Sequence, residues 1–346
     1  MKAVIYKGNG VISLENHPVP DIQKETDALV RVTLTTICSS DIHIKHGAVP
    51  RARKNIVLGH EFVGEVVRVG RGVRKIRPAD RVAVNVETFC GKCWFCQRGY
   101  VNNCTDKHGG WALGCRIDGG QAEYVRIPFA DNCLTKIPDS VSDEAALFTG
   151  DLLSTGYWAA KMADIRLSDT VAVIGAGPAG IAVMKCAGLY NPSRIIGIDL
   201  DDSRLNLLKK NGIADVILNP LSDDVEKVVL DMTEGRGADS VLEVAGNKES
   251  FEMAWKIARP NAVVGVVAMY EEAQVLPLPD MYGKNLTFKT GGVDASNCEE
   301  ILRLIENRKL DTSCMITHRT SLDHIMEAYE VFEHKKDGII KYAIRV

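Results

Sequence analysis

A histidine and an acid stand side by side at His60 and Glu61, inside the glycine-bounded run Gly59-His60-Glu61-Phe62-Val63-Gly64. Two further groups that can bind a metal are Cys38 upstream and Asp151 downstream. A thiolate, an imidazole and a carboxylate would make three ligands and leave a fourth tetrahedral position open, as in catalytic zinc sites. Taken alone, His60 and Glu61 could equally be a solvated pair at a turn before a strand. Their combination with the other two groups favours a metal site.

A second set of metal-binding groups is a run of four cysteines with the spacing Cys90-x2-Cys93-x2-Cys96-x7-Cys104. Four thiolates in one loop can close a tetrahedral site and leave no position for water, which predicts structural zinc. An iron–sulfur cluster is the chemical alternative, because four cysteines would satisfy it too. The charged residues between the thiols suit an exposed loop that depends on the metal for its structure.

A third group of residues indicates a nucleotide site. The predicted strand Thr170-Val171-Ala172-Val173-Ile174 runs into Gly175-Ala176-Gly177-Pro178-Ala179-Gly180, which opens an apolar helical segment. A Gly-x-Gly-x-x-Gly motif in this context predicts a dinucleotide site, with the pyrophosphate at the helix N-terminus. Gly175, Gly177, Pro178, Ala179 and Gly180 are therefore candidate cofactor-binding residues.

Asp199 ends the next predicted strand, Arg194-Ile195-Ile196-Gly197-Ile198, nineteen residues after Gly180. There its carboxylate can accept hydrogen bonds from the adenosine ribose, and it would repel a 2′-phosphate, so we expect NAD rather than NADP. Arg204 favours NADP instead, because an arginine near this position can accommodate the 2′-phosphate.

The spacing Gly59-His60-Glu61-x2-Gly64-x5-Gly70-x2-Val73 resembles the signature of zinc-containing medium-chain alcohol dehydrogenases. The resemblance extends over essentially the whole chain. Asp151 follows Gly150 where better-known members carry cysteine, which is similar to the bacterial secondary-alcohol branch. The resemblance implies a catalytic zinc held by Cys38, His60 and Asp151 in a cleft between two domains. It also implies structural zinc on the four cysteines, two zinc ions per subunit in all, and NAD.

The resemblance further assigns roles to single residues. Ser40 and His43 match the family's proton relay, and Glu61 is either a fourth zinc ligand or an acid behind the ligands. Thr155 matches a residue that packs against the nicotinamide. Trp111 matches a residue that forms part of the wall of the substrate pocket. The alternative is that Trp111 is an aromatic residue of the core. Asp41 lies three residues after Cys38. This spacing suits either a helix cap or a hydrogen-bond partner of a ligand histidine.

Two kinds of periodicity divide the chain. The first 150 residues alternate short β-branched runs with turn signals, which predicts a β-rich, partly open barrel, GroES-like by resemblance. From about residue 153, strands alternate with helices, as in a Rossmann doubly wound parallel sheet. We therefore expect an α/β protein with a discontinuous catalytic zinc-binding domain at 1–152 and 291–346, and an NAD-binding domain at 153–290.

The overall composition limits the classes of partner. A net charge of −3 over 346 residues gives no basic face for nucleic acid. No apolar run of 18 residues suggests a membrane span, and the ten cysteines favour metal binding in a reducing compartment, so we expect a cytoplasmic protein. The run Val263-Val264-Gly265-Val266-Val267 could be an edge strand that pairs with another subunit, or buried core. Family resemblance implies a homodimer or homotetramer.

Together these features predict a zinc-dependent oxidoreductase that transfers hydride between NAD(H) and a secondary alcohol and its ketone. Within the same family, polyol or sugar, formaldehyde-type and hydroxysteroid dehydrogenases are alternatives. A non-catalytic NAD-binding protein is a distant one, because it would have no need of the ligands and the relay residues together.

Overall fold

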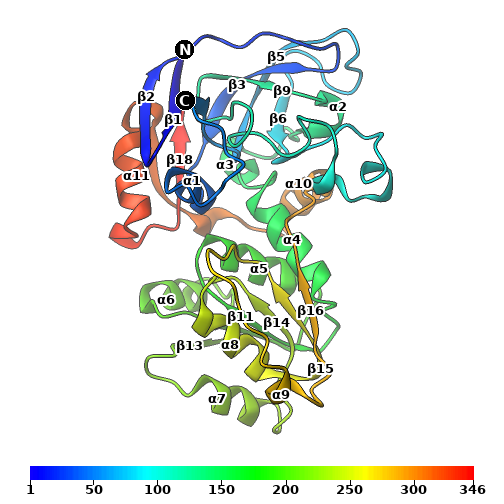
Figure 1. Cartoon of the computed structure of the whole chain (residues 1–346), viewed down its shortest axis with the longest axis vertical. Helices are drawn as coiled ribbons and strands as arrows, with labels where there is room; N and C mark the ends of the chain where they lie inside the picture. Colours follow the sequence, from blue (N-terminus) through cyan, green and yellow to red (C-terminus); the bar gives the residue numbers. More distant parts are fainter. The chain divides into compact units, whose positions relative to one another are not determined.

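The computed structural model describes all residues 1–346, and the chain forms two compact units. Unit 1 comprises Met1–Ser154 with Val293–Val346, and unit 2 comprises Thr155–Gly292. Figure 1 shows that unit 1 is built mainly of strands and unit 2 of alternating strands and helices. The helix α4 (Leu152–Met162) carries the chain from the first unit into the second.

Unit 1 is organised around one mostly antiparallel sheet with the strand order β10-β6-β5-β3-β18-β17, and β9 also pairs with β3. A smaller sheet has the order β2-β1-β4, and β7 pairs with β8. The strands are β1 Lys2–Gly8, β2 Val11–Asn16, β3 Ala28–Thr35, β4 Ile56–Val57, β5 Phe62–Val69, β6 Arg81–Val84, β7 Glu87–Thr88, β8 Gly110–Trp111, β9 Tyr124–Ile127, β10 Leu134–Lys136, β17 Ile316–Ser321 and β18 Lys341–Arg345. The helices are α1 Ser39–Lys45, α2 Ala130–Cys133, α3 Asp143–Ala146, α10 Cys298–Glu306 and α11 Ile325–Glu333.

The core of unit 1 lies between these strands. Alternate residues along β3, β5, β6 and β9 point inward because successive strand side chains face opposite sides of the sheet. The buried set includes Val30, Val32, Phe62, Val66, Val82, Val84, Val125 and Ile127.

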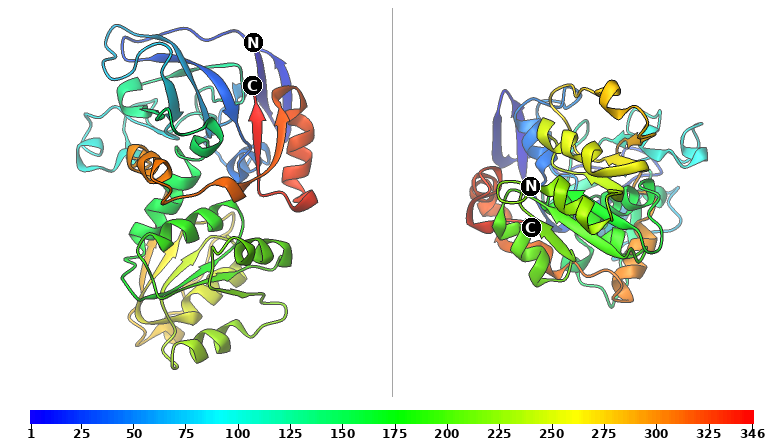
Figure 2. Two further views of the ribbon diagram at one scale, coloured as in Figure 1. Left: turned by 180° about the vertical axis from the view of Figure 1, so that it is seen from behind. Right: turned by 90° about the horizontal axis from the view of Figure 1, so that it is seen from below.

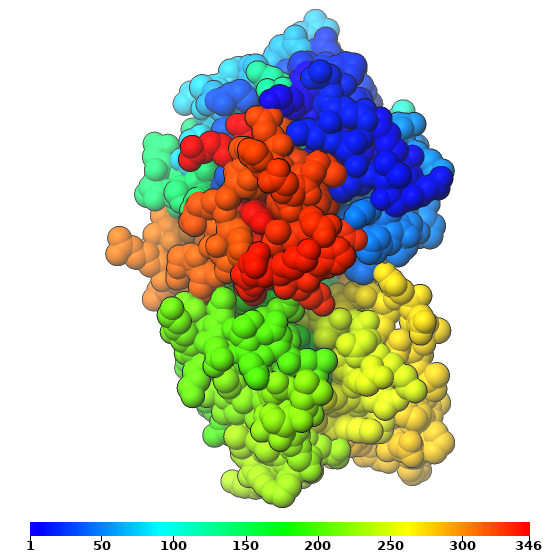
Figure 3. Space-filling model, turned by 90° about the vertical axis from the view of Figure 1, so that its left-hand side faces the viewer, coloured from blue at the N-terminus to red at the C-terminus, as the bar shows by residue number.

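The end of the chain returns to complete unit 1. Strand β18 pairs antiparallel with β3, so residues from the two ends of the sequence share one sheet. Figure 2 shows β18 and α11, drawn in red, beside the blue N-terminal strands, and Figure 3 shows the orange and red C-terminal part of the chain against the blue N-terminal part. Residues near position 340 can therefore reach groups near position 60.

Unit 2 is a six-stranded, wholly parallel sheet with the order β13-β12-β11-β14-β15-β16 and helices on both faces (Figure 2). The strands are β11 Thr170–Ile174, β12 Arg194–Ile198, β13 Val216–Leu218, β14 Ala238–Glu243, β15 Ala258–Val266 and β16 Thr287–Thr290. The helices are α5 Pro178–Gly188, α6 Asp202–Lys210, α7 Val225–Met232, α8 Lys248–Ile257 and α9 Leu278–Met281. The strand order reverses between β11 and β14, and ligands bind at such switch points in open parallel sheets.

The predicted fold class, a β-rich domain combined with a doubly wound parallel sheet, is confirmed. Of the two alternatives for the run Val263–Val267, the edge strand is wrong, because its residues up to Val266 lie in β15, between β14 and β16. The edge of the sheet on that side is β16. None of the helices has the length and apolar character needed to cross a membrane.

Candidate active site and structural metal site

Four side chains that can bind a metal meet in unit 1. One ligand atom from each of Cys38, His60, Glu61 and Asp151 lies within 4.8 Å of the others. His60 and Glu61 are each 1% exposed, whereas Cys38 and Asp151 are half-buried. The fold of unit 1 brings these side chains together, although Cys38 and Asp151 are far apart in the sequence.

Local backbone structure presents each of these groups. Cys38 follows β3 and is the N-cap residue of α1, while His60 and Glu61 fill the short connection between β4 and β5. Gly59 has φ +93°, and a Cβ atom there would lie 2.7 Å from the backbone nitrogen of Gln121, so only glycine fits. Asp151 stands immediately before α4.

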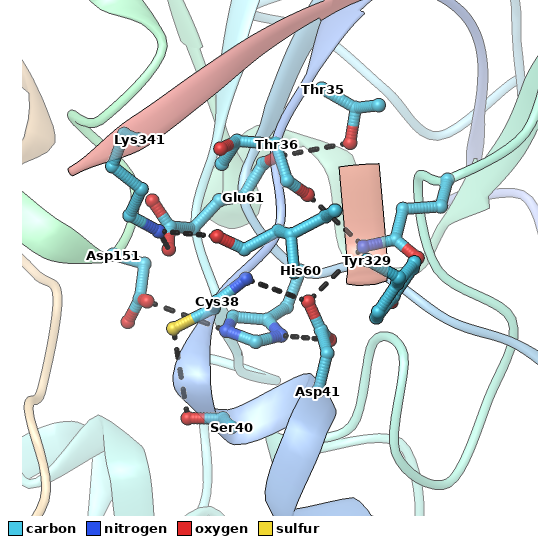
Figure 4. Close-up of polar contacts among 12 residues, drawn as sticks. Thr35, Thr36, Cys38, Ser40, Asp41, His60, Glu61, Asp151, Tyr329 and Lys341 are labelled. Atoms are coloured by element: carbon cyan, nitrogen blue, oxygen red, sulfur yellow. Dashed lines mark hydrogen bonds and ion pairs between the residues drawn. The ribbon is translucent and has the colours of Figure 1, made fainter. Parts of the chain in front are cut away.

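The ring of His60 lies between two carboxylates (Figure 4). Its Nδ1 is 3.3 Å from Oδ1 of Asp41, and its Nε2 is 3.4 Å from Oδ2 of Asp151. Burial lowers the pKa of His60, but Asp41, then Asp151 and Cys38, raise it well above the ordinary value. The surroundings of this ring therefore favour positive charge.

Asp41 holds both α1 and the histidine in place. Its Oδ2 accepts hydrogen bonds from the backbone N–H of Cys38 at 2.9 Å and from Nε2 of Gln121 at 3.1 Å. The hydroxyl of Tyr329 donates to Oε1 of Gln121 at 2.7 Å. Asp41 thus caps the helix and also faces His60, so the two readings of this residue are compatible.

Lys341 from β18 forms a buried ion pair with Glu61, at 2.5 Å between Nζ and Oε1. Both side chains are 1% exposed, and Nζ also donates to the carbonyl oxygen of Ile37 at 3.0 Å. Burial lowers the pKa of Lys341, but Glu61 and Cys38 raise it above its ordinary range. This partner was missed from the sequence, because a lone lysine near the end of a strand carries no motif.

These residues fit a divalent cation. Oε2 of Glu61 is buried without a hydrogen-bond partner. A thiolate, a carboxylate and an imidazole nitrogen converge on the same point, and these are the ligand types of zinc. A cation there would balance the excess of acidic groups around His60.

The remaining residues predicted at this site lie around the cluster. Ser40 and His43 are three residues apart in α1 and so share a helix face, with Oγ of Ser40 3.8 Å from Sγ of Cys38. Trp111 is 8% exposed, and its ring meets that of His60 edge-on with 5.6 Å between centroids. Trp111 therefore lies beside the cluster and contacts the ring of a candidate ligand.

The four cysteines of the second motif also converge, with all four Sγ atoms within 4.8 Å of one another. Sγ of Cys93 lies 3.4 Å from that of Cys96, and the backbone N–H of Cys90 donates to Sγ of Cys104 at 3.3 Å. Backbone N–H groups of Cys96 and Thr105 hold the pKa of the Cys93 thiol below its usual range. None of the ten cysteines is in a disulfide, and this set is a closed four-thiolate site suited to structural zinc.

The glycine motif of unit 2 lies at the switch point of the sheet, between β11 and α5. Gly175 has φ +108°, and a Cβ atom at Gly180 would lie 1.8 Å from the carbonyl oxygen of Gly175. Gly177 is different, because a Cβ atom there would meet only Arg204, at 3.5 Å. Space is therefore left above the start of α5, as the approach of a pyrophosphate would require.

Asp199 lies at the end of β12 and faces this turn. Oδ2 accepts from the backbone N–H of Ala176 at 2.6 Å, and Oδ1 accepts from that of Asp201 at 2.9 Å. The guanidinium of Arg204 is 4.0 Å from Oδ2. Asp199 thus has a structural role in the turn that the sequence did not reveal. Thr155 lies in α4, where it is half-buried.

Comparison with known proteins identifies the family. Residues 24–139 match the alcohol dehydrogenase GroES-like domain, and residues 178–307 match the zinc-binding dehydrogenase domain. An alcohol dehydrogenase of Cupriavidus necator is 35% identical, covering 100% of this chain and 98% of that protein. This chain belongs to the zinc-dependent alcohol dehydrogenases.

Two further relatives place it within the zinc-dependent alcohol dehydrogenases. A zinc-dependent alcohol dehydrogenase 2 from Streptococcus pneumoniae, solved in its apo form, is 35% identical with a TM-score of 0.93, over 100% of this chain and 99% of that one. An NADP-dependent isopropanol dehydrogenase of Thermoanaerobacter brockii is 33% identical over 91% of each chain. The predictions of family, of a GroES-like domain with a Rossmann domain, and of zinc-dependent oxidoreduction of an alcohol are confirmed. Zinc and a nicotinamide cofactor follow from membership of this family.

Proposed function

We propose that this alcohol dehydrogenase transfers hydride between NAD(H) and a secondary alcohol and its ketone. The observation that carries the proposal is the convergence of Cys38, His60 and Asp151 within one ligand sphere, with aspartate as the oxygen ligand. The likeness to an isopropanol dehydrogenase supports a secondary alcohol as substrate.

Cys38, His60 and Asp151 would hold the catalytic zinc, and the chemistry supplied there is Lewis acidity, which lowers the pKa of an alcohol hydroxyl. Asp41 fixes the ring of His60 from the side opposite Asp151, which determines the nitrogen that faces the ligand sphere. Lys341 holds Glu61 behind the ligands in the resting protein. Glu61 keeps one unpaired oxygen, so it remains available as a transient fourth ligand.

Ser40 and His43 would carry the proton away from the substrate hydroxyl. Ser40 lies next to the thiol of Cys38, and its hydroxyl can accept a hydrogen bond while donating another. His43, one helical turn further along α1, would receive the proton next. Trp111 would form part of the wall of the substrate pocket.

NAD is proposed as the preferred cofactor because Asp199 places a carboxylate at the end of β12. A 2′-phosphate next to this carboxylate would be repelled. Arg204 favours the opposite choice, and the isopropanol dehydrogenase of Thermoanaerobacter brockii uses NADP. The binding residues proposed with Asp199 are Gly175, Gly177, Pro178, Ala179, Gly180, Arg204 and Thr155.

The domain roles and the assembly are proposed on the same basis. Unit 1 would be the catalytic zinc-binding domain and unit 2 the NAD-binding domain. Exposed apolar side chains collect in one short segment before β16, namely Val275, Leu276, Leu278 and Tyr282, which supports a homodimer or homotetramer. A cytoplasmic location is proposed because four free thiolates for zinc require a reducing compartment.

The test is the initial rate of NADH formation at 340 nm with zinc-loaded protein on primary and secondary alcohols, polyols and hydroxysteroids, with NADP in parallel. We expect turnover of secondary alcohols with NAD. A protein that binds NADH but oxidises none of these alcohols would support the non-catalytic alternative. Preference for another alcohol class would select one of the other dehydrogenase types.

A further inference from the structure

Gln121 is a buried amide that lies behind Asp41, the carboxylate that faces the ring of His60 (Figure 4). It is 0% exposed, and its backbone is fixed beside the residues that precede His60. The backbone N–H of Gln121 donates to the carbonyl oxygen of Leu58 at 2.9 Å, and its carbonyl oxygen accepts from the N–H of Val4 at 2.9 Å. Backbone pairing therefore fixes where this amide lies.

Both N–H bonds and the oxygen of this amide are used. Nε2 donates to Oδ2 of Asp41 at 3.1 Å and to the carbonyl oxygen of Thr36 at 3.0 Å, while Oε1 accepts from the hydroxyl of Tyr329 at 2.7 Å. A carboxylate and a carbonyl oxygen can only accept, so the amide nitrogen must face these two groups and the amide oxygen must face Tyr329. The chemistry of its neighbours therefore fixes the orientation of Gln121.

Tyr329 reaches the amide from α11, and charged side chains fix this helix to α1. Glu333, one turn beyond Tyr329, pairs with Lys45 and lies 2.6 Å from Nε2 of His46. Burial and then the nearby Asp41 raise the pKa of Tyr329 well above its ordinary value, so its hydroxyl keeps the proton that it donates. Helix α11 thus supplies a donor in a fixed position.

The amide determines which oxygen of Asp41 is left for the histidine. Oδ2 already accepts from Gln121 and from the backbone N–H of Cys38, whereas Oδ1 has no hydrogen-bond partner other than the facing Nδ1 of His60, at 3.3 Å. A proton on Nδ1 therefore points to Asp41, and the lone pair of Nε2 is left on the side of Asp151.

We infer that Gln121 is a positioning residue, which sets the orientation and tautomer of His60 through Asp41. Tyr329 holds the amide in the orientation that this role requires. The role rests on the proposed function, in which His60 is a ligand of the catalytic zinc. The support of that ligand then extends to a helix from the far end of the chain.

The first measurement is the affinity of the Cys38 site for zinc, by competition with a chelator, in protein whose four-cysteine site is kept loaded. Gln121→Met should weaken this affinity by about tenfold or more, the effect of losing a group behind a metal ligand. Tyr329→Phe leaves the donor to Asp41 in place, so the affinity should fall less, by about threefold.

The double variant Gln121→Met with Tyr329→Phe separates positioning from stability. In Gln121→Met alone, the hydroxyl of Tyr329 is buried without a partner, so removing it should restore part of the lost thermal midpoint. The affinity for zinc should stay low in the double variant, since Asp41 still lacks its donor. An affinity that recovers together with the midpoint would show that the amide acts only through stability, and would overturn the role.

A second measurement reports the geometry of the ligands. With cobalt(II) at the Cys38 site and zinc retained on the four cysteines, the visible absorption bands of cobalt should shift in Gln121→Met, because they depend on the arrangement of the ligands. Tyr270→Phe is the matched control. It removes a hydroxyl that donates to Oε2 of Glu243 at 2.6 Å in unit 2, and it should change neither the affinity nor the spectrum.

Unchanged affinity and an unshifted spectrum in Gln121→Met would overturn the role. If this variant fails to fold, the same two measurements on Tyr329→Phe decide, and values equal to those of the unmodified protein overturn it. If the unmodified protein binds no ion at the Cys38 site, the proposed function fails instead. Gln121 is then judged by solvent exchange of the Nδ1 proton of His60, measured by NMR: faster exchange in Gln121→Met supports the link through Asp41, and equal rates overturn it.

Discussion

At the scale of single residues, Glu61, the acid beside the proposed zinc ligands, depends on the ammonium group of Lys341 for its counter-charge. Replacement by methionine would leave the carboxylate of Glu61 buried without its counter-charge. Breaking a buried pair in this way costs about 3 to 5 kcal/mol, so Lys341→Met should lower the free energy of unfolding by that amount. Denaturant unfolding of zinc-loaded protein measures it.

The double variant Lys341→Met with Glu61→Gln is the control for this pair. Because it removes both charges, it should be more stable than the sum of the single variants predicts, by about 1 kcal/mol or more. Additive losses would show that the two side chains are not energetically coupled.

Asp199 offers a second test at the scale of one residue. Asp199→Asn removes the charge but keeps an oxygen for the backbone N–H of Ala176, so the turn should survive. We expect the ratio of kcat/KM for NADP to that for NAD to rise about tenfold or more, the effect of removing one close repulsion. Adding Arg204→Leu should reverse most of this gain. An unchanged ratio in Asp199→Asn would refute the role given to the carboxylate.

The sequence predicted the side chains of the candidate site better than it predicted the residues that hold those side chains in place. Cys38, His60 and Asp151 could be proposed from the sequence because their residue types and the glycines near His60 and Asp151 form a pattern. Lys341 and Tyr329 were missed because they arrive from the far end of the chain and carry no local signal.

At the scale of elements, the two candidate metal sites differ in how they are built. The four-cysteine site is closed within one loop, whereas the site at Cys38 gathers its ligands from three separate connections and includes an oxygen ligand. An oxygen ligand should bind zinc less tightly than a thiolate. A mild chelator should therefore remove activity and one zinc ion per chain before the thermal midpoint falls.

Metal analysis, activity and circular dichroism recorded on the same samples measure this order. Cys104→Ser is the complementary variant, because it should lower the thermal midpoint while the Cys38 site keeps its zinc. Loss of both ions together with the fold, in a single step, would argue against two independent sites.

Strands and helices with strong local patterns were predicted closely. Strands β11 and β12 occupy the predicted strands, and helix α5 begins within the glycine motif as expected. The position of β15 in the sheet was left open between an edge and the core, because an apolar run has the same sequence pattern in an internal strand and in an edge strand. The edge on that side is β16, with the sequence Thr-Phe-Lys-Thr, whose short polar pattern gave no strand signal.

At the scale of the whole molecule, the exposed apolar segment before β16 predicts association between subunits. Leu278 and Tyr282 are 67% and 94% exposed, respectively. Changing both to aspartate should shift the mass measured by light scattering from an oligomer to a single chain, because charge would have to be buried in the interface. Aspartate at the exposed Leu221, which is distant in sequence, is the control. An unmodified protein that elutes as a monomer would exclude the proposed assembly.

The return of the chain to β18 also sets an order of events during synthesis. Residues 155–292 form a unit of their own and can fold once they have left the ribosome. Unit 1 cannot finish at that stage, because β18 and the ion pair that holds Glu61 depend on residues translated some fifty positions later. A nascent chain therefore carries every proposed zinc ligand well before it carries the lysine that restrains the acid behind them.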